Sequence, residues 1–506
     1  MPGKKVSGDY PTPVAFASRV VAYLEEAHAI KPDTVLEPSC GEGNFLVAAL
    51  RLNAARYIGV ELNPVYCKRA RQRFRGDERV EIFQKDFFSY PLAELSSASL
   101  LIIGNPPWVL SSTLGALDAV NPVLRDNPRS LKGLDAITGE GDFDLAEAFC
   151  LRLIRNFKHS VTTLALILKS SVARRVVEYL HAQRIGAAAE VLRFDAYAVF
   201  HVHTAAAVLC LRLDPALPPP ESCSVYAFDS AKPVFLEKLV FSAAGNLHKA
   251  GTDIFGGVSE LVWRQGVKHD CSKVMVFKKQ GESLINGLGE KADIEPCCIY
   301  PLLKGSETRE AIRTDFVNYV LLTQSFVGES TDRLATTVPR SYAYLKAHEA
   351  FFLKRKSSVY KSAPPFAIFG IGPYSFAPYK VIISGFYYEP RFSLAYSSGA
   401  RPVIPDDTCY FLGFDNFDVA YAVMLCLNSR RVCDYLKSHT FEDAKRPYTK
   451  KLLMQLSLKK MVQSLSLDEL RASEVRLKLE KRINDSMLGN LLSFMQQRGR
   501  QEEPVP

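Results

Sequence analysis

The sequence GNPPW, which ends at Trp108, places an amide, two prolines and an indole side by side. The apolar run Leu100–Ile103 precedes it and has the length and branched residues of a buried strand, so Asn105 is expected at a strand's carboxyl end. Ligands bind at that end in open α/β sheets. Pro106 and Pro107 fix φ and lack N–H groups, which leaves rigid carbonyl acceptors. This corner is therefore predicted to bind a planar ligand that carries an amino group.

A second pattern, VLEPSCGEGNFL at residues 35–46, predicts a strand, a glycine turn and the start of a helix. It differs from the dinucleotide fingerprint, because Gly41 and Gly43 are present but the third glycine is missing. Glu37 at the tip of the strand would repel a pyrophosphate. The pattern favours a ligand with a cationic group.

Acidic residues follow three successive expected strands. Glu61 closes the next strand and can accept hydrogen bonds from both hydroxyls of a ribose. Asp86, in FQKDFF, can accept from an adenine amino group, with Phe87 beside it. An ammonium near Glu37, a ribose and an adenine without a phosphate together match S-adenosylmethionine. The sequence thus predicts this cofactor.

Apolar strand-like runs alternate with helical patterns through residue 213, which predicts a mostly parallel, doubly wound α/β sheet. Proline-rich DPALPPPES, at residues 214–222, then indicates a linker or long loop. Short β-rich pieces dominate from there to about residue 415, and helical patterns return from Asp418. We expect a methyltransferase domain at 1–220 and a mixed β/α domain ending in helices at 221–506.

The order of the motifs resembles that of the gamma-arranged N6-adenine DNA methyltransferases of bacterial restriction–modification systems. The motifs DYPTP, LEPSCGEG, GVELNP, KDFF and GNPPW match that family in order. The segments GDFDLAEAFCLRLI at 141–154 and VFHVHTAAAVL at 199–209 resemble the two motifs that follow. The resemblance covers residues 9–213 and implies a Rossmann-like domain followed by a target-recognition domain.

The resemblance also implies roles for individual residues. Thr12 would bind the methionine carboxylate, Phe143 would pack on the cofactor adenine, and Phe200 would lie against the target base opposite Trp108. The cofactor-binding residues are then Thr12, Glu37, Pro38, Gly41, Glu61, Asp86, Phe87, Asn105 and Phe143, and the catalytic ones are Asn105, Pro106, Pro107 and Trp108. The family usually has tyrosine or phenylalanine where this chain has Trp108.

The chemistry expected of such a site starts from the weak nucleophilicity of the adenine amino group, whose lone pair is delocalised into the ring. Hydrogen bonds to the Asn105 side-chain oxygen and the Pro106 carbonyl would localise that pair. The target adenine must also be flipped out of the duplex to reach the site. Alignment of nitrogen, methyl and sulfonium is then expected to supply most of the catalysis.

Three segments of the second half, YPLLKGSE, RKSSVYK and FGIGPYSFAPYKVIISG, resemble the recognition region of bacterial restriction–modification methyltransferases. This resemblance implies double-stranded DNA as the partner, and a cognate restriction endonuclease as a second one. The expected DNA-binding residues are Lys304, Arg355, Lys356, Lys361 and Lys380.

The composition agrees with a globular cytoplasmic protein. The chain has 506 residues, of which 47% are hydrophobic and 23% charged, and its formal net charge of +9 is moderate. No apolar stretch is long enough for a membrane span, and the start MPGKKVSGDY lacks a signal-peptide core. The 11 cysteines include no C-x-x-C pair, so we expect neither a metal site nor a disulfide framework.

Other classes of protein also fit parts of the pattern. RNA base methyltransferases and protein-glutamine methyltransferases use similar corners for planar amides. A restriction or specificity component that only binds DNA is a further alternative, although intact Asn105, Glu61 and Asp86 argue against a decayed enzyme. Asp406 with Asp443–Lys445 resembles a nuclease metal site, but the surrounding sequence predicts a helix rather than the strand such a site needs.

Overall fold

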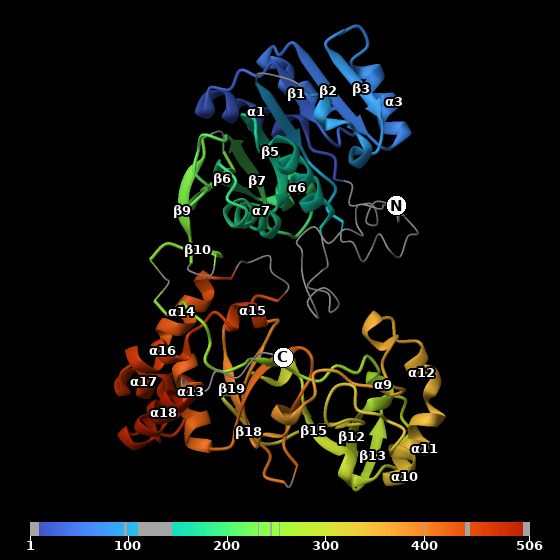
Figure 1. Cartoon of the computed structure of the whole chain (residues 1–506), viewed down its shortest axis with the longest axis vertical. Helices are drawn as coiled ribbons and strands as arrows, with labels where there is room; N and C mark the ends of the chain where they lie inside the picture. The colour runs from blue at the N-terminus through green and yellow to red at the C-terminus, as the bar shows by residue number, and fades with distance from the viewer. Residues whose placement is uncertain are drawn as a thin grey trace. The chain divides into compact units, whose positions relative to one another are not determined.

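The computed structural model describes residues 10–95, 99–109, 144–230, 232–242, 245–251, 254–399, 401–440 and 446–498. The chain forms two compact units, Met1–Ala250 and Gly251–Pro506, and both combine strands with helices (Figure 1). Each unit is described by itself.

The first unit is built on one 10-stranded sheet with the order β10-β9-β8-β6-β7-β5-β4-β1-β2-β3. Strands β5, β4, β1, β2 and β3 are parallel neighbours, whereas β7 runs antiparallel to both β5 and β6. The strands are β1 Thr34–Glu37, β2 Arg56–Glu61, β3 Val80–Gln84, β4 Leu100–Gly104, β5 Thr162–Lys169, β6 Ala187–Phe194, β7 Ala206–Leu213, β8 Ser222–Ala227, β9 Val234–Phe241 and β10 Leu247–Lys249.

Helices alternate with these strands, as the sequence predicts. They begin where local chemistry favours a helix start: Asn63 caps α3 with Pro64 at its first position, and Asp144 caps α6. The helices are α1 Val14–His28, α2 Asn44–Ala49, α3 Pro64–Arg73, α6 Leu145–Phe157, α7 Ser170–Ala182 and α8 Ala196–Phe200, with 3-10 turns η1 Leu50–Leu52, η2 Phe87–Ser89 and η3 Leu92–Glu94. The doubly wound α/β fold is confirmed.

The order β3-β2-β1-β4 decides where a ligand can bind in this sheet. Strand β1 leads outward to β2 on one side, and β4 returns on its other side, so the order reverses between β1 and β4. Such a switch point leaves a crevice outside the carboxyl ends of the two strands. Glu37 ends β1 and Asn105 directly follows β4, so both residues lie at this point.

The boundary between the units lies later in the chain than residue 220. Strand β8 pairs in parallel with β6, and β9 and β10 extend the same sheet to Lys249. The proline-rich segment packs back on the sheet, because the Pro218 carbonyl accepts from the Ala187 N–H at 3.2 Å. This segment is therefore a loop within the first unit. The domain boundary expected after residue 220 falls between β7 and β8, two strands of the same sheet.

The second unit contains a 5-stranded sheet of order β11-β21-β18-β19-β16 and a 6-stranded sheet of order β14-β13-β12-β17-β15-β20. Its strands are β11 Arg264–Gln265, β12 Val276–Gln280, β13 Ser283–Asn286, β14 Lys291–Ala292, β15 Ile299–Leu303, β16 Ile312–Arg313, β17 Asn318–Leu321, β18 Tyr379–Ser384, β19 Phe392–Ala395, β20 Ile404–Pro405 and β21 Cys409–Phe414.

Two groups of helices lie at opposite ends of this unit (Figure 1). Helix α13 is buried along Val419–Leu427 and packs on the first of these sheets in one core. The expectation of a β-rich stretch up to residue 415 misses α10–α12, the first of which starts at Leu334. The helices are α9 Ser272–Met275, α10 Leu334–Thr337, α11 Pro339–Ala347, α12 Glu349–Leu353, α13 Phe417–Leu427, α14 Arg430–Ser438, α15 Lys450–Leu453, α16 Leu458–Ser464, α17 Leu467–Leu477 and α18 Asp485–Arg498, with 3-10 turns η5 Pro296–Cys298, η6 Gly305–Glu307, η7 Ser358–Tyr360 and η8 Pro373–Phe376.

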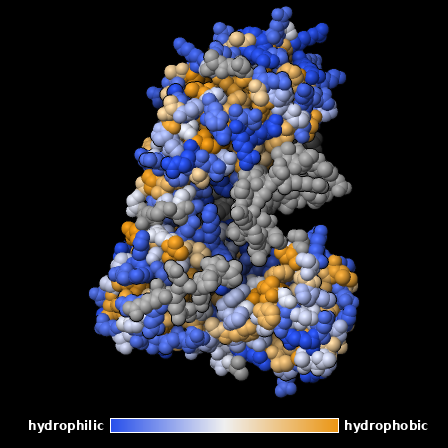
Figure 2. Space-filling model, in the orientation of Figure 1, coloured by the Kyte–Doolittle hydropathy of each residue, from blue (hydrophilic) through white to orange (hydrophobic). Residues whose placement is uncertain are grey.

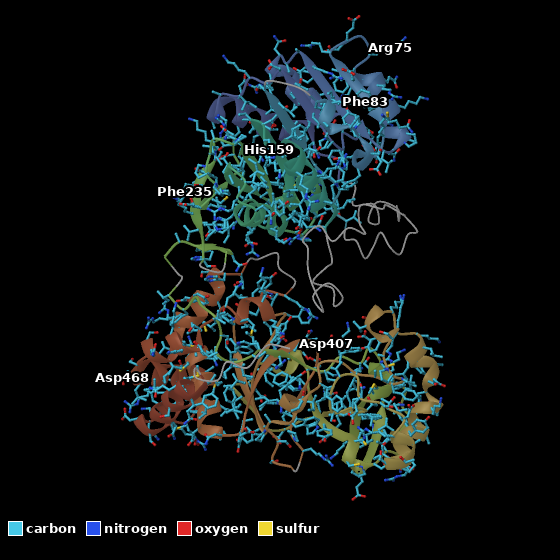
Figure 3. The ribbon with its side chains drawn as sticks, in the orientation of Figure 1. Arg75, Phe83, His159, Phe235, Asp407 and Asp468 are labelled. Atoms are coloured by element: carbon cyan, nitrogen blue, oxygen red, sulfur yellow. The ribbon has the colours of Figure 1, made fainter. Side chains whose placement is uncertain are left out.

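The surface mixes residue types. Figure 2 shows hydrophilic and hydrophobic residues side by side on the visible face of each unit. An exposed apolar residue of the first unit is Phe235 on β9, which Figure 3 labels. Within the described ranges, no helix is both long and apolar enough to cross a membrane.

Candidate active site

Asn105 lies at the end of β4 with its side-chain amide held in one orientation. Its Nδ2 donates to the backbone carbonyl of Tyr10 at 2.9 Å. The amide oxygen Oδ1 is buried and has no hydrogen-bond partner among the described residues. The Ser39 hydroxyl donates to the Asn105 carbonyl at 3.3 Å, which ties the corner to the end of β1. The structure thus leaves one strong acceptor available, and a buried acceptor of this kind is costly unless a ligand pairs with it.

Trp108 is buried, and its indole is held by the sheet. It is 7% exposed, and its Nε1 donates to the Ile167 carbonyl of β5 at 3.3 Å. Its ring lies 5.7 Å from that of Phe200 at an interplanar angle of 76°, and 5.6 Å from that of Tyr10. Two rings that stack on opposite faces of a base must be parallel. The Trp108 and Phe200 rings are not parallel here, so they do not form the expected stacking pair. The rings form an aromatic cluster beside the corner, and their stacking on a target base remains a prediction.

Glu37 is a buried carboxyl group at the switch point. It is 3% exposed, and its Oε2 accepts from the Leu46 N–H at 3.3 Å. The absence of a side chain at Gly104 lets β4 end against it, since a Cβ there would lie 3.3 Å from the Glu37 Cγ. Burial raises the pKa of Glu37 well above its usual value, and the charge of Glu61 adds to this. A cationic group of a ligand would offset both effects.

Glu61, at the end of β2, is oriented by two backbone groups. The Gly41 N–H donates to its Oε2 at 2.7 Å, and the Asn63 N–H donates to its Oε1 at 2.6 Å. Gly41 has a φ of +52°, in the left-handed region, which is the conformation that aims its N–H at the carboxylate. The glycine turn and the acid that the sequence singles out separately therefore form one structural feature.

Asp86 and Phe87 lie where β3 leads into η2. The Asp86 Oδ1 accepts from the Phe88 N–H at 2.9 Å and so caps this short helix. Phe87 is 4% exposed and stacks on Phe149 of α6, with ring centroids 4.4 Å apart. The structure places Phe87 in the core between β3 and α6, so at least one face of its ring is already covered. Phe143 lies outside the described residues.

Thr12 and Pro38 line the same end of the sheet. Thr12 is 5% exposed, and its Oγ1 has no hydrogen-bond partner within the described part of the chain. Its carbonyl accepts from the Asn44 Nδ2 at 2.7 Å, which attaches the N-terminal segment to α2. Pro38 is buried, with its Cδ 3.6 Å from a Cβ built on Gly104. Thr12 therefore adds a second buried, unpaired polar atom to that of Asn105.

Sequence reasoning missed two further features of the corner. Tyr10 supplies the carbonyl that orients Asn105, although it lies within the DYPTP motif. Lys169, at the end of β5, pairs with the buried carboxylate of Asp144 at 2.7 Å. The residue after Asp144 donates its backbone N–H to the Val109 carbonyl at 2.8 Å, so this ion pair adjoins the corner. The position of this lysine at the end of an apolar strand was the sequence signal that could have indicated the ion pair.

The residues predicted to bind DNA have different environments. Lys380 is 0% exposed, and its Nζ donates to the Ala377 carbonyl at 2.5 Å, so the structure contradicts its assignment to DNA. It lies in β18, which pairs with strands on both sides. Arg355 donates to the Ala367 carbonyl at 2.6 Å and lies 3.7 Å from the Tyr360 ring, so it holds a loop in place. Lys356 and Lys361 are exposed, and Lys304 is half-buried.

A metal-dependent nuclease finds no support in the described residues, because no group of three or more His, Cys, Asp or Glu side chains is arranged to hold a metal ion there. Asp406 accepts from the Thr408 N–H at 3.1 Å and shapes a turn. Asp443–Lys445 lie outside the described residues. The cysteines that the structure describes are free thiols, most of them buried.

Comparison with known proteins gives the class of this site. A family model described as a methyltransferase domain matches residues 35–127, a range that includes all but the first residue of β1, together with β2, β3, β4 and the corner at Asn105. Among solved structures, the Type IIL restriction–modification enzyme MmeI in complex with DNA has a TM-score of 0.56 at 13% identity, covering 97% of this chain and 73% of that chain. The fold of the first unit is that of a Rossmann-like methyltransferase.

Two curated relatives are similar to this chain in sequence, and the first matches it over most of its length. The type II methyltransferase M.NspV of Nostoc sp. (strain ATCC 29411 / PCC 7524) is 34% identical over 467 residues, which cover 89% of this chain and 96% of that protein. The type II methyltransferase M.CvrRI of Paramecium bursaria Chlorella virus XZ-6E is 34% identical over 91 residues, 18% of this chain and 22% of that protein. The chain belongs to the type II methyltransferases of restriction–modification systems, which confirms the resemblance drawn from the motif order.

Proposed function

We propose that this chain transfers a methyl group from S-adenosylmethionine to the N6 amino group of an adenine flipped out of double-stranded DNA. The observation that carries the proposal is the orientation of the Asn105 amide. Its nitrogen is committed to the Tyr10 carbonyl, and its buried oxygen is left as an acceptor. An exocyclic amino group is a donor, so it fits this acceptor.

The residues around the switch point fit the cofactor. Glu37 is a buried carboxylate suited to an ammonium group, and Glu61 presents an oriented carboxylate to ribose hydroxyls. The unpaired hydroxyl of Thr12 can donate to the methionine carboxylate. Asp86 lies at the end of the neighbouring strand, where the adenine would be placed. S-adenosylmethionine, when bound, supplies an electrophilic methyl group on a sulfonium sulfur.

The corner would act on the substrate nitrogen by hydrogen bonding and alignment. The Asn105 oxygen and the Pro106 carbonyl accept from the amino group, which localises its lone pair toward the methyl carbon. S-adenosylmethionine would supply the methyl group, so the corner only has to hold the substrate nitrogen in line with it. The amino proton leaves to water afterwards, so no strong base is needed. Holding the reacting atoms in line can contribute several kcal/mol or more.

Access to the site requires the target base to leave the duplex, at a cost of a few kcal/mol. The aromatic cluster of Tyr10, Trp108 and Phe200 would form the apolar wall beside the extruded base. Tyr10 is the partly exposed member of the cluster, so it presents the more accessible ring. DNA as the partner is further supported by MmeI, which shares the fold and was solved in complex with DNA.

Mapping modified bases tests the proposal directly. The chain is expressed in cells that lack other adenine methylation, and their native DNA is sequenced by a method that detects modified bases. We expect N6-methyladenine at one short sequence, and none in cells expressing the Asn105→Ala variant at equal level. Methylcytosine in the DNA, or methylation of RNA with unmodified DNA, would show that the assigned substrate is wrong.

A further inference from the structure

The turn between β18 and β19 carries three consecutive aromatic residues on the surface of the second unit. Phe386 is 46% exposed and Tyr388 is 50% exposed, while Tyr387 between them is half-buried. Side chains of this size are usually withdrawn from water, since each exposes a large apolar area. In the chain they come directly after the segment FGIGPYSFAPYKVIISG, whose last residues include β18.

The backbone of this turn is held in place by neighbouring segments. The Tyr448 hydroxyl donates to the Tyr388 carbonyl at 2.6 Å, and the Gly385 N–H donates to the Thr408 carbonyl at 2.9 Å. A Cβ at Gly385 would lie 3.3 Å from the Tyr410 ring, so glycine permits the close approach. The exposed rings are therefore presented by an ordered backbone.

Guanidinium groups from two other segments lie against these rings. The Cζ of Arg446 is 4.8 Å from the Phe386 centroid, and that of Arg309 is 5.6 Å from the Tyr387 centroid. The acid of the turn, Glu389, is paired with Lys437 at 2.7 Å. Arginine stacked on an aromatic ring keeps its outward N–H groups available for phosphate oxygens.

Arg309 lies two residues after YPLLKGSE, the first recognition-like motif of the second half, which ends at Glu307. This motif includes η6, where the Gly305 N–H donates to the Thr408 Oγ1 at 3.0 Å and a Cβ at Gly305 would lie 2.9 Å from the Ser384 Oγ. Thr408 follows Asp407, which Figure 3 labels. The fold thus brings YPLLKGSE and the end of FGIGPYSFAPYKVIISG next to each other.

We propose that the turn Phe386–Tyr388, with Arg309 and Arg446, is a contact surface for double-stranded DNA. The two arginines bind phosphate oxygens, and the Phe386 ring packs on sugars and base edges. The two arginines favour an anionic partner, and the exposed rings favour one with apolar faces, which duplex DNA offers in its grooves. This inference rests on the proposed function, and it places the DNA contact after the end of β18 instead of at Lys380.

The test measures binding of the full-length chain to a fluorescently labelled DNA duplex of mixed sequence, by anisotropy at several salt concentrations. We expect Phe386→Ala to weaken binding about ten-fold, because one aromatic contact is lost. Arg446→Gln should lower the slope of log affinity against log salt by about 1, as for one phosphate contact. The matched controls are Phe326→Ala, at another exposed phenylalanine, and Arg471→Gln.

The outcomes separate this inference from the proposed function. Wild-type chain that binds the duplex, with the turn variants indistinguishable from the controls, overturns the contact surface alone. Wild-type chain that binds no DNA and modifies none overturns both. Variants that lose affinity for a matched RNA duplex while keeping that for DNA show that the partner is wrong. Unchanged cofactor binding by each variant shows that its loss of DNA binding is local.

Discussion

The side-chain nitrogen of Asn105 and the backbone carbonyl oxygen of Tyr10 are 2.9 Å apart, although the two residues are 95 positions apart in the chain. This hydrogen bond fixes which end of the amide faces the site. It also ties the DYPTP motif to the corner at the end of β4, in addition to the cofactor role proposed for Thr12. The orientation of the Asn105 amide thus depends on a segment that precedes the first strand.

We expect Asn105→Ala to lower methyl transfer about a hundred-fold or more, because the acceptor that aligns the amino group is removed. Cofactor affinity should stay nearly unchanged, since the free Oδ1 is assigned to the substrate. Tritium transfer to DNA and calorimetry with S-adenosylmethionine measure the two quantities. Turnover at the wild-type rate would rule out the proposed role of the amide.

Glu37 should make cofactor binding depend on pH. Burial raises the pKa of its carboxyl group, whereas an ammonium group favours the charged form, so binding releases a proton. Affinity should therefore fall about ten-fold for each pH unit below the raised pKa of the free protein. Calorimetry over a pH series measures this, and the Glu37→Gln variant should bind weakly with no such dependence.

The same carboxyl group should affect the stability of the cofactor-free chain. A folded-state pKa above the unfolded value means that the group's contribution to the free energy of unfolding falls as pH rises through the folded pKa. Without cofactor, the Glu37→Gln variant should thus be more stable than wild type at neutral pH. With cofactor bound, it should be less stable than wild type. Equal melting temperatures in both conditions would contradict the burial of a charged group at this position.

Trp108 should contribute to stability through its packing and its hydrogen bond to Ile167. Trp108→Ala is expected to cost about 3–5 kcal/mol, as for other large-to-small changes in a core. Trp108→Phe should cost about 1–2 kcal/mol, because the Ile167 carbonyl loses its donor. Urea unfolding of the cofactor-free chain measures both values. A stable alanine variant that fails to hold a flipped base would instead support a direct stacking role.

Lys380 should make the stability of the second unit depend on pH in the alkaline range. Burial lowers its pKa from the usual value to about 7, so the unfolded chain binds more protons between pH 7 and the unfolded pKa. The free energy of unfolding should rise with pH over this range, by up to about 1.4 kcal/mol per unit. Lys380→Met should remove this dependence and leave DNA binding unchanged. Weaker DNA binding by this variant would restore the sequence-based assignment.

Much of the first unit could be predicted because its local signals agree with the fold. The predicted strand Leu100–Ile103 lies within β4, since a continuous apolar run bounded by polar residues has one favourable placement in a buried sheet. Glu37 and Glu61 end their strands and Asn105 directly follows its own, and the strand order then brings those ends to one edge. These positions depend mainly on neighbours in the sequence.

Lys380, Trp108 and Arg355 show what the sequence alone could not decide. A lysine beside aromatic residues reads as a surface contact, but pairing of β18 on both sides buries Lys380. Whether the Trp108 ring faces a ligand or the Ile167 carbonyl depends on β5, which lies far along the chain. Side-chain burial and hydrogen-bond partners arise from long-range packing, so the sequence determined the motifs and their strand ends, whereas the tertiary structure decided which polar atoms are paired and which are left for a ligand.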